Sequence, residues 1–203
     1  MEKKRLNIAL AGNPNSGKST VFNNLTGGHA HVGNWPGVTV EKKEGEFRFK
    51  DCEVTVVDLP GTYTLTAYSP DEKIARDFII KEKPERVVVI VDASNLERNL
   101  YLVIQILELG ADVILVLNMM DRVRNKGITV DTKKLSEVFG IPVVETVANK
   151  GEGVEELKKV IVEGIEKRRD SFKIDYGMDI ENEIEGLEKL LNVSGYPSRW
   201  VAI

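Results

Sequence analysis

The chain has 203 residues, which is enough for one domain of ordinary size and part of a second. Its net charge of −4 argues against a broad basic face for nucleic acid, and its single cysteine excludes an internal disulfide. No apolar run is long enough for a transmembrane helix, and the run near the N-terminus is too short for a secretory signal. These properties predict a soluble, cytoplasmic protein in which Cys52 is a core residue.

Apolar runs alternate with amphipathic segments along the first 169 residues. The runs predict strands at 6–11, 53–58, 86–92, 112–118 and 142–146. Apolar residues three and four apart predict helices at 21–26, 71–83, 99–109, 132–139 and 154–169. Residues 41–50 alternate more loosely, which favours an antiparallel edge strand joined to its neighbour as a hairpin. We therefore expect an α/β fold, with a mostly parallel sheet of six strands, one of them an antiparallel edge strand, and helices on both faces.

The stretch GNPNSGKS, Gly12 to Ser19, lies between the first strand and the first helix and matches the P-loop pattern. Its glycines let successive backbone N–H groups face phosphate oxygens, and the helix adds its positive N-terminal end. Lys18 should reach the β- and γ-phosphates, and the Ser19 hydroxyl should ligate Mg²⁺. The expected phosphate-binding residues are Asn13, Asn15, Ser16, Gly17, Lys18, Ser19 and Thr20.

The stretch DLPGT begins with Asp58 at the end of a predicted strand. An aspartate here can hold Mg²⁺ through water, and the Gly61 N–H can meet the γ-phosphate. With Thr39 in the preceding loop, these residues form the sensor set of a nucleotide switch. Thr62 occupies the position at which Ras-type enzymes carry the glutamine that orients the attacking water, so either hydrolysis is absent or another group supplies the missing catalysis.

Asn118-Met119-Met120-Asp121 resembles the base-reading N-K-x-D of GTPases. Asp121 would accept hydrogen bonds from guanine, whereas adenine would leave its oxygens unpaired, so GTP is expected over ATP. Met119 replaces the usual lysine and can still cover the base, at a cost in nucleotide affinity. Ala148 would offer its N–H to the guanine O6, and Val147 departs from the residue usual at that point.

The composition changes after Arg169. A polar, irregular stretch is followed by a segment that places Ile180, Ile184, Leu187 and Leu191 on one helical face. We expect a GTPase domain over residues 1–169, and a linker with the beginning of a truncated helical domain over residues 170–203.

These motifs occur in the order typical of the TRAFAC class of small GTPase domains, a P-loop (Ras-like) fold. Three further stretches, VGNWPGVTVEKKEG from Val32, DLPGTYTL from Asp58 and DEKIARDFI from Asp71, resemble the cytosolic GTPase domain of the ferrous iron transport protein B (FeoB) family. The resemblance implies a regulatory GTPase that changes conformation with GTP or GDP, with a membrane permease in the same protein as its partner. It places the domain at the cytoplasmic face of the membrane, and a homo-oligomer is compatible with it.

The resemblance also implies slow, potassium-activated hydrolysis in the absence of the glutamine. Asn15 would bind K⁺ together with backbone carbonyls of Gly33 and Trp35, and the catalytic set would be Asn15, Lys18, Thr39 and Gly61. Trp35 could equally be a packing residue.

His29 and His31 form an H-x-H pair that could touch iron. Two imidazoles in a loop with no carboxylate partner are more often solvated, and we favour that interpretation.

Two other functions remain open at this point. One is a free potassium-activated GTPase of ribosome or RNA assembly, which shares the phosphate and base motifs but normally carries more positive charge. The other is a nucleotide-binding scaffold without useful hydrolysis, for which Thr62 is the main argument.

Overall fold

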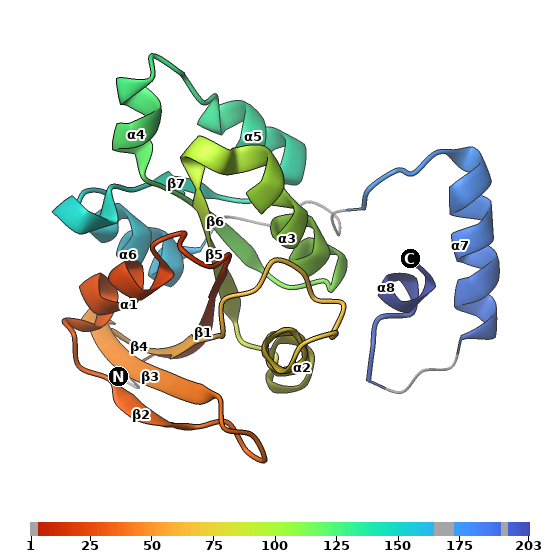
Figure 1. Cartoon of the computed structure of the whole chain (residues 1–203), viewed down its shortest axis with the longest axis horizontal. Helices are drawn as coiled ribbons and strands as arrows, with labels where there is room; N and C mark the ends of the chain where they lie inside the picture. The colour runs from red at the N-terminus through yellow and green to blue at the C-terminus, as the bar shows by residue number, and fades with distance from the viewer. Residues whose placement is uncertain (1–3, 165–172, 192–194) are drawn as a thin grey trace.

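The computed structural model describes residues 4–164, 173–191 and 195–203, and its centre is one sheet of order β2-β3-β4-β1-β5-β6-β7 (Figure 1). Strand β1 pairs in parallel with β4 and β5, and β6 and β7 continue the parallel part. Strands β2 and β3 are antiparallel to their neighbours. The strands are β1 (Lys4–Gly12), β2 (His31–Asn34), β3 (Glu41–Phe49), β4 (Cys52–Asp58), β5 (Arg86–Asp92), β6 (Val113–Asn118) and β7 (Val143–Glu145).

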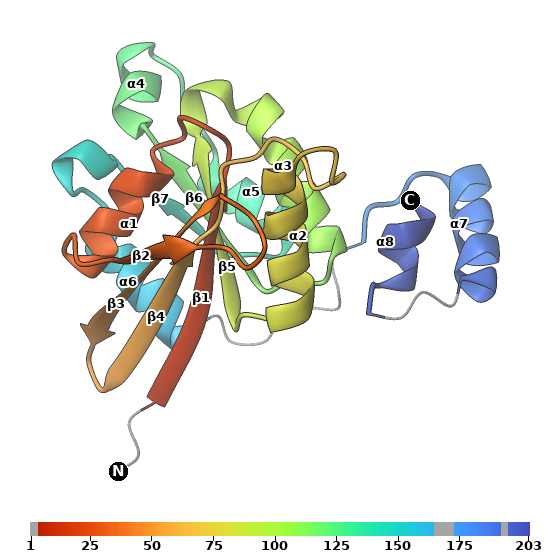
Figure 2. The ribbon, with the colours of Figure 1, turned by 60° about the horizontal axis from the view of Figure 1, so that its bottom comes forward.

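Helices cover both faces of the sheet (Figure 2). Apolar side chains form one core cluster on each face. Helices α1 and α6 bury their apolar residues in one cluster, and α2 to α5 bury theirs in the other. The helices are α1 (Lys18–Thr26), α2 (Pro70–Glu82), α3 (Leu96–Glu108), α4 (Met120–Asn125), α5 (Thr132–Phe139), α6 (Val154–Glu163), α7 (Met178–Leu190) and α8 (Ser198–Ala202), with 3₁₀ turns η1 (Ala93–Asn95) and η2 (Ala148–Lys150).

The fold class is confirmed, but the strand count was wrong by one. The sheet has seven strands rather than six, because residues 31–34 form β2 outside β3. Every residue of β2 is exposed, so the alternation by which a half-buried strand is recognised is missing from its sequence. Only β3 is antiparallel to the rest, because β2 is antiparallel to β3 and so runs in the same direction as β4. The antiparallel strand therefore lies next to the edge of the sheet rather than at it.

The strand register brings the sequence motifs to one edge of the sheet. Leu10 pairs with Asp58, Gly12 pairs with Ile90, and Asp92 pairs with Asn118. The parallel strands therefore end at the same edge, where ligands bind in folds of this type. Strand β5 is valine-rich and buried on both faces, as expected for a central parallel strand.

Helices α7 and α8, which follow the last strand, lie together at one side of the sheet and its helices (Figures 1 and 2). On α7 only Ile184 of the expected apolar face is buried, while Ile180 and Leu187 are exposed. The sequence did not suggest helix α8, which carries Trp200. Trp200 and Tyr196, which precedes the helix, lie near α2 and against the core cluster there. Helix α6 ends at Glu163, and both the expected continuation to residue 169 and the boundary at 169/170 lie outside the described residues.

Candidate nucleotide-binding site

The P-loop connects β1 to α1 with two residues in the left-handed region. Asn15 has φ 65°, which asparagine tolerates better than most residues, and Gly17 has φ 87°. Lys18 is the first residue of α1, so the free N–H groups of this helix face the loop that precedes it. Asn15, Ser19 and Thr20 are exposed, whereas Asn13 and Ser16 are buried.

Gly17 lies against the base-reading segment. A side chain at this position would overlap the amide nitrogen of Asn118, and it would also be strained by the positive φ. Gly12 is enclosed in the same way by the Ile90 carbonyl of the neighbouring strand. The Asn118 side chain at Gly17 and the Ile90 backbone at Gly12 come close enough to favour glycine at both positions.

Asn118 joins three segments that are far apart in the sequence. Its amide nitrogen donates to the Ser16 carbonyl at 2.9 Å, and its amide oxygen accepts from Thr146 Oγ1 at 3.1 Å and from the Ala148 N–H at 3.0 Å. The side chain is 3% exposed. A buried amide with these partners fixes the P-loop relative to the loop after β7 before any nucleotide is present.

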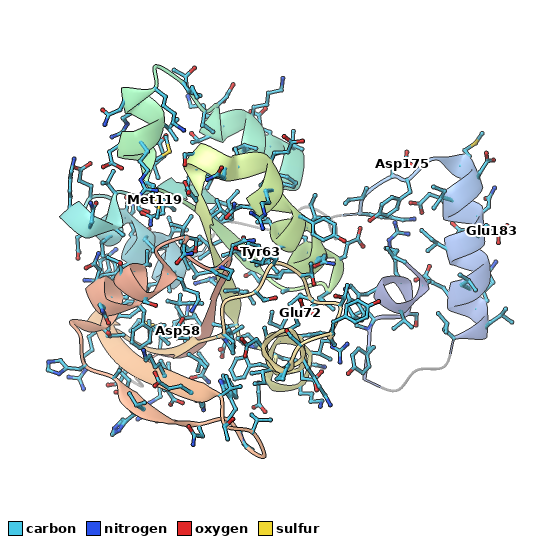
Figure 3. The ribbon with its side chains drawn as sticks, viewed as in Figure 1. Asp58, Tyr63, Glu72, Met119, Asp175 and Glu183 are labelled. Atoms are coloured by element: carbon cyan, nitrogen blue, oxygen red, sulfur yellow. The ribbon has the colours of Figure 1, made fainter. Side chains whose placement is uncertain are left out.

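The residues expected to contact the base differ in their exposure to solvent and in their backbone conformation. Met119 has φ 63° and immediately precedes α4, and Figure 3 shows it across the P-loop from Asp58. Asp121 is partly exposed, with Lys150 Nζ 3.9 Å from its carboxylate, so it can accept hydrogen bonds from a ligand. Val147 is buried in the core and donates its N–H to Glu152, and the Ala148 N–H is already engaged by Asn118.

Lys18 forms an ion pair with Asp58. Both side chains are largely buried, with exposures of 11% and 8%. Asp58 is the nearest compensating charge for Lys18 while no phosphate is present, because a buried charge requires a partner. The Ser19 hydroxyl and the Asp58 carboxylate are oxygen donors of the kind that Mg²⁺ takes, so the residues fit that ion. Thr39 is exposed, in the loop between β2 and β3.

The DLPGT segment runs along the P-loop. Leu59 donates its N–H to Leu10, Thr62 donates its N–H to Gly12 at 3.2 Å, and Gly61 lies beside Pro14. The Thr62 hydroxyl is buried and donates to the Thr64 carbonyl at 2.6 Å. Its hydrogen-bonding capacity is therefore used within a local turn.

Two of the candidate potassium ligands, Gly33 and Trp35, belong to the β2–β3 hairpin in this structure. Gly33 belongs to the β2–β3 pairing, opposite Lys42, and the Trp35 carbonyl accepts from the Val38 N–H at 3.2 Å. The Trp35 side chain is buried, in agreement with the packing interpretation. Asparagine and carbonyl oxygens suit a hard cation, but these two carbonyls must leave the hairpin to reach one.

Residues that the sequence interpretation missed surround the stretch from DLPGT to the start of α2, here called the second switch segment. Glu72 accepts from the backbone N–H groups of Tyr68 and Ser69, and Ser69 caps α2 in return. Burial alone would raise the pKa of Glu72, but hydrogen bonds from Thr64, the two backbone groups and Thr66 hold it below its usual value. The S-x-x-E pattern of a capping box was readable in the sequence.

Two buried polar side chains of the P-loop are also unpartnered within the part of the chain that the structure describes. In Asn13 both the amide nitrogen and the amide oxygen lack a partner among the described residues, and in Ser16 the hydroxyl lacks one. Orphaned buried donors and acceptors are rare unless a ligand or water completes them. Nothing in the sequence pattern distinguishes Asn13 from a loop residue.

Neither histidine belongs to a metal-binding group in this structure. His29 and His31 are exposed, and among residues 4–164, 173–191 and 195–203 no cluster of three or more His, Cys, Asp or Glu side chains could hold a metal ion. No helix in those same residues has the length and apolar character to cross a bilayer.

The fold and the site together define a P-loop GTPase domain, because the P-loop, the DLPGT segment and the base-reading loop meet at one edge of the sheet. The family model of ferrous iron transport protein B matches residues 6–161. The chain therefore belongs to the ferrous iron transport protein B (FeoB) family.

Individual relatives agree with this assignment. An Fe(2+) transport protein A/Fe(2+) transporter FeoB fusion protein of Porphyromonas gingivalis is 44% identical over 98% of this chain and 24% of its own length. The Fe(2+) transporter FeoB of Salmonella typhimurium is 52% identical over 78% of this chain and 21% of its own. The chain thus spans about a quarter of the length of these relatives.

Solved structures show the same fold. The cytosolic domain of the T. maritima FeoB iron transporter in its GMPPNP form superposes with a TM-score of 0.91 at 44% identity, covering 97% of this chain and 79% of that one. The FeoB G-domain from Methanococcus jannaschii gives a TM-score of 0.70 at 54% identity, covering 78% of this chain and 96% of that one. The T. maritima domain has also been solved in a GDP form.

Proposed function

We propose that this chain binds GTP and hydrolyses it slowly, and that it is the regulatory domain of a ferrous iron membrane transporter. The observation that carries the proposal is the buried amide of Asn118, which fastens the P-loop to the base-side loop. The phosphate and base subsites are thereby held at a fixed separation, so a ligand with both groups needs little reorganisation to bind. FeoB relatives solved with GDP and with GMPPNP support a guanine nucleotide as that ligand.

The phosphate end has distinct roles for its side chains. Lys18 would exchange Asp58 for the β- and γ-phosphates, and Asn13, Asn15, Ser16, Gly17 and Thr20 would complete the cradle. Ser19, Thr39 and Asp58 would hold Mg²⁺, which neutralises charge on the phosphate oxygens. Thr39 must move from its exposed position to take part, while the Gly61 N–H would meet the γ-phosphate.

Catalysis without a glutamine is assigned to Asn15 and to residues 33–39, here called the first switch loop. Asn15 and the carbonyls of Gly33 and Trp35 would hold K⁺, which supplies positive charge beside the phosphates in place of an arginine finger. Thr62 is not assigned as general base, because its hydroxyl already donates to Thr64 and is shielded from solvent.

Base recognition is assigned to Asp121, Met119 and the loop at Val147 and Ala148. Asp121 would accept two hydrogen bonds from guanine, and Met119 would cover the ring. Val147 acts through its backbone and its packing, because the side chain is in the core. An O6 contact from Ala148 would share a hydrogen that now goes to Asn118.

The proposed context is a transporter with the GTPase unit over residues 1–169 and the beginning of a helical unit over 170–203. The permease portion of the same protein would be its partner, at the cytoplasmic face of the membrane, and homo-oligomers are compatible with this arrangement. Family membership favours this context over a free GTPase of RNA assembly.

The test is GTP hydrolysis by the purified chain, measured as phosphate release with Mg²⁺ and K⁺ present. We expect turnover that Lys18→Ala abolishes while Lys73→Ala, an exposed lysine on α2, leaves it unchanged. Equal rates in the parent and in Lys18→Ala would remove the P-loop from the mechanism. The transporter context is tested by the matching substitution in the whole protein, which should reduce ferrous iron uptake.

A further inference from the structure

Trp35 is the one buried residue within residues 31–39, all of which the structure describes. Its side chain is 8% exposed, while its neighbours Asn34 and Pro36 are exposed. A large aromatic side chain inserted into the core from an otherwise exposed loop restricts where that loop can lie.

The indole ring packs against the helix that follows the DLPGT segment. It meets the ring of Phe78 on α2 edge-to-face, with the ring centroids 5.5 Å apart and the planes at 76°. Lys42 of β3 lies over its face, with Nζ 5.4 Å from the ring centroid. Both arrangements are attractive, so the ring links the loop at 35–40 directly to α2 and to β3.

The backbone around this ring forms a closed turn. The Trp35 N–H donates to the Val40 carbonyl at 2.9 Å, and the Trp35 carbonyl accepts from Val38. Thr39 is thereby held in the exposed part of the loop, and the carbonyl of Trp35 is occupied. While the ring stays in place, neither the Thr39 side chain nor the Trp35 carbonyl can reach a nucleotide or its ions.

Two features make this packing reversible. The indole Nε1 is buried and has no hydrogen-bond partner in the described part of the chain, so the packed state leaves a donor unsatisfied that water would satisfy. A groove of about 930 Å³, lined by Trp35, Val38, Ile74 and Phe78 among others, adjoins the ring. The ring can therefore leave without displacing α2.

We propose that Trp35 is a positioning residue whose indole ring holds the loop at 35–40 in an open hairpin against α2, and that the ring must leave Phe78 before Thr39 can reach the phosphate site. This inference rests on the proposed function, because it assigns a cause to the open position of the first switch. It predicts that weakening the contact between Trp35 and Phe78 favours the GTP-bound form over the GDP-bound form.

The first experiment follows Trp35 by fluorescence in a Trp200→Phe variant, which leaves it as the only tryptophan of the chain. We expect acrylamide quenching to increase at least about twofold when GMPPNP, Mg²⁺ and K⁺ are added, and to stay unchanged with GDP, because only closure withdraws the ring from the core. Equal quenching with both nucleotides would overturn the proposal.

The second experiment measures nucleotide affinities of Phe78→Leu by calorimetry. Loss of one aromatic pair should strengthen GMPPNP binding about two- to tenfold and leave GDP binding unchanged. The matched control is Phe49→Leu, a half-buried phenylalanine on β3 outside the two switches, which should alter neither affinity. An unchanged GMPPNP affinity in Phe78→Leu would contradict the proposal. Absence of GTP hydrolysis in the parent, with the quenching difference still present, would count against the proposed function alone.

Discussion

Asn118 shows how one side chain can organise a site made from distant parts of the sequence. The pattern N-x-x-D predicted a residue near the base, and the structure places it between the P-loop and the loop after β7. Its neighbour Asp121 remains partly exposed, with one carboxylate oxygen bonded to the Arg122 N–H. We therefore propose that Asn118 holds the loops of the site together and that Asp121 recognises the ligand.

Guanine specificity can be tested at these two residues. We expect GDP to bind at least about 100-fold more tightly than ADP, because a carboxylate that a bound base covers but leaves unpaired costs about 3 kcal/mol. Asp121→Ala should remove most of this preference, whereas Asn118→Ala should weaken GDP binding by loosening the loops. Calorimetric titration of both nucleotides measures each effect, and comparable ADP binding by the parent would refute the base assignment.

The N-terminus of helix α2 is determined by a capping box. Ser69 accepts from the Glu72 N–H at 3.2 Å, and the Glu72 carboxylate accepts from Tyr68 and Ser69 in return. Pro70 begins the helix, where its missing N–H costs nothing. The cap therefore sets where the second switch segment ends and the rigid helix begins.

Removing this cap should have a measurable cost. Ser69→Ala is expected to lower the free energy of unfolding by about 1 kcal/mol. For a chain of this size that corresponds to a Tm decrease of about 2–4 °C. Ser69→Thr, which keeps the hydroxyl, should change little. A thermal scan in which both variants match the parent would show that the cap does not stabilise α2.

The elements that the sequence predicted well are those whose burial leaves a pattern. The central strands and α5 have the expected ranges because apolar spacing reports burial directly. Strand β2 is exposed throughout and was missed, and α8 is a short helix whose aromatic residues gave no helical period. The ion pair of Lys18 with Asp58 depends on side-chain packing across two strands, which no local pattern encodes.

For the whole molecule, charged side chains connect α7 and α8 to each other and to helices α2 and α3. Arg199 donates to Glu181 on α7 and to the Ile174 carbonyl, and its guanidinium is 3.4 Å from Glu108 on α3. Tyr196 stacks with Trp200, and Arg76 of α2 lies over both rings. The attachment of the C-terminal helices therefore includes contacts with the helix that follows the second switch segment.

This attachment should weaken in acid. Hydrogen bonds from Arg199, then from Lys173 and the Tyr176 N–H, lower the pKa of Glu181 from 4.5 to about 2. Because the folded pKa lies below the ordinary one, the stabilisation is complete above about pH 4.5 and is lost as the pH falls towards 2. Trp200 fluorescence in a Trp35→Phe variant should change over that range. An equal change after adding Glu181→Gln would assign it to another group.

Turnover of GTP in potassium and in sodium, at constant ionic strength, tests most directly whether a monovalent cation at Asn15 replaces the missing glutamine. We predict at least a several-fold higher rate in potassium, since screening is then equal and only the size of the ion differs. Asn15→Ala should lose most of this stimulation and retain GDP binding, whereas Thr62→Ala should stay within about tenfold of the parent. Equal rates in the two salts, or a collapse of activity in Thr62→Ala with Asn15→Ala unaffected, would contradict the assignment and return the catalytic role to Thr62.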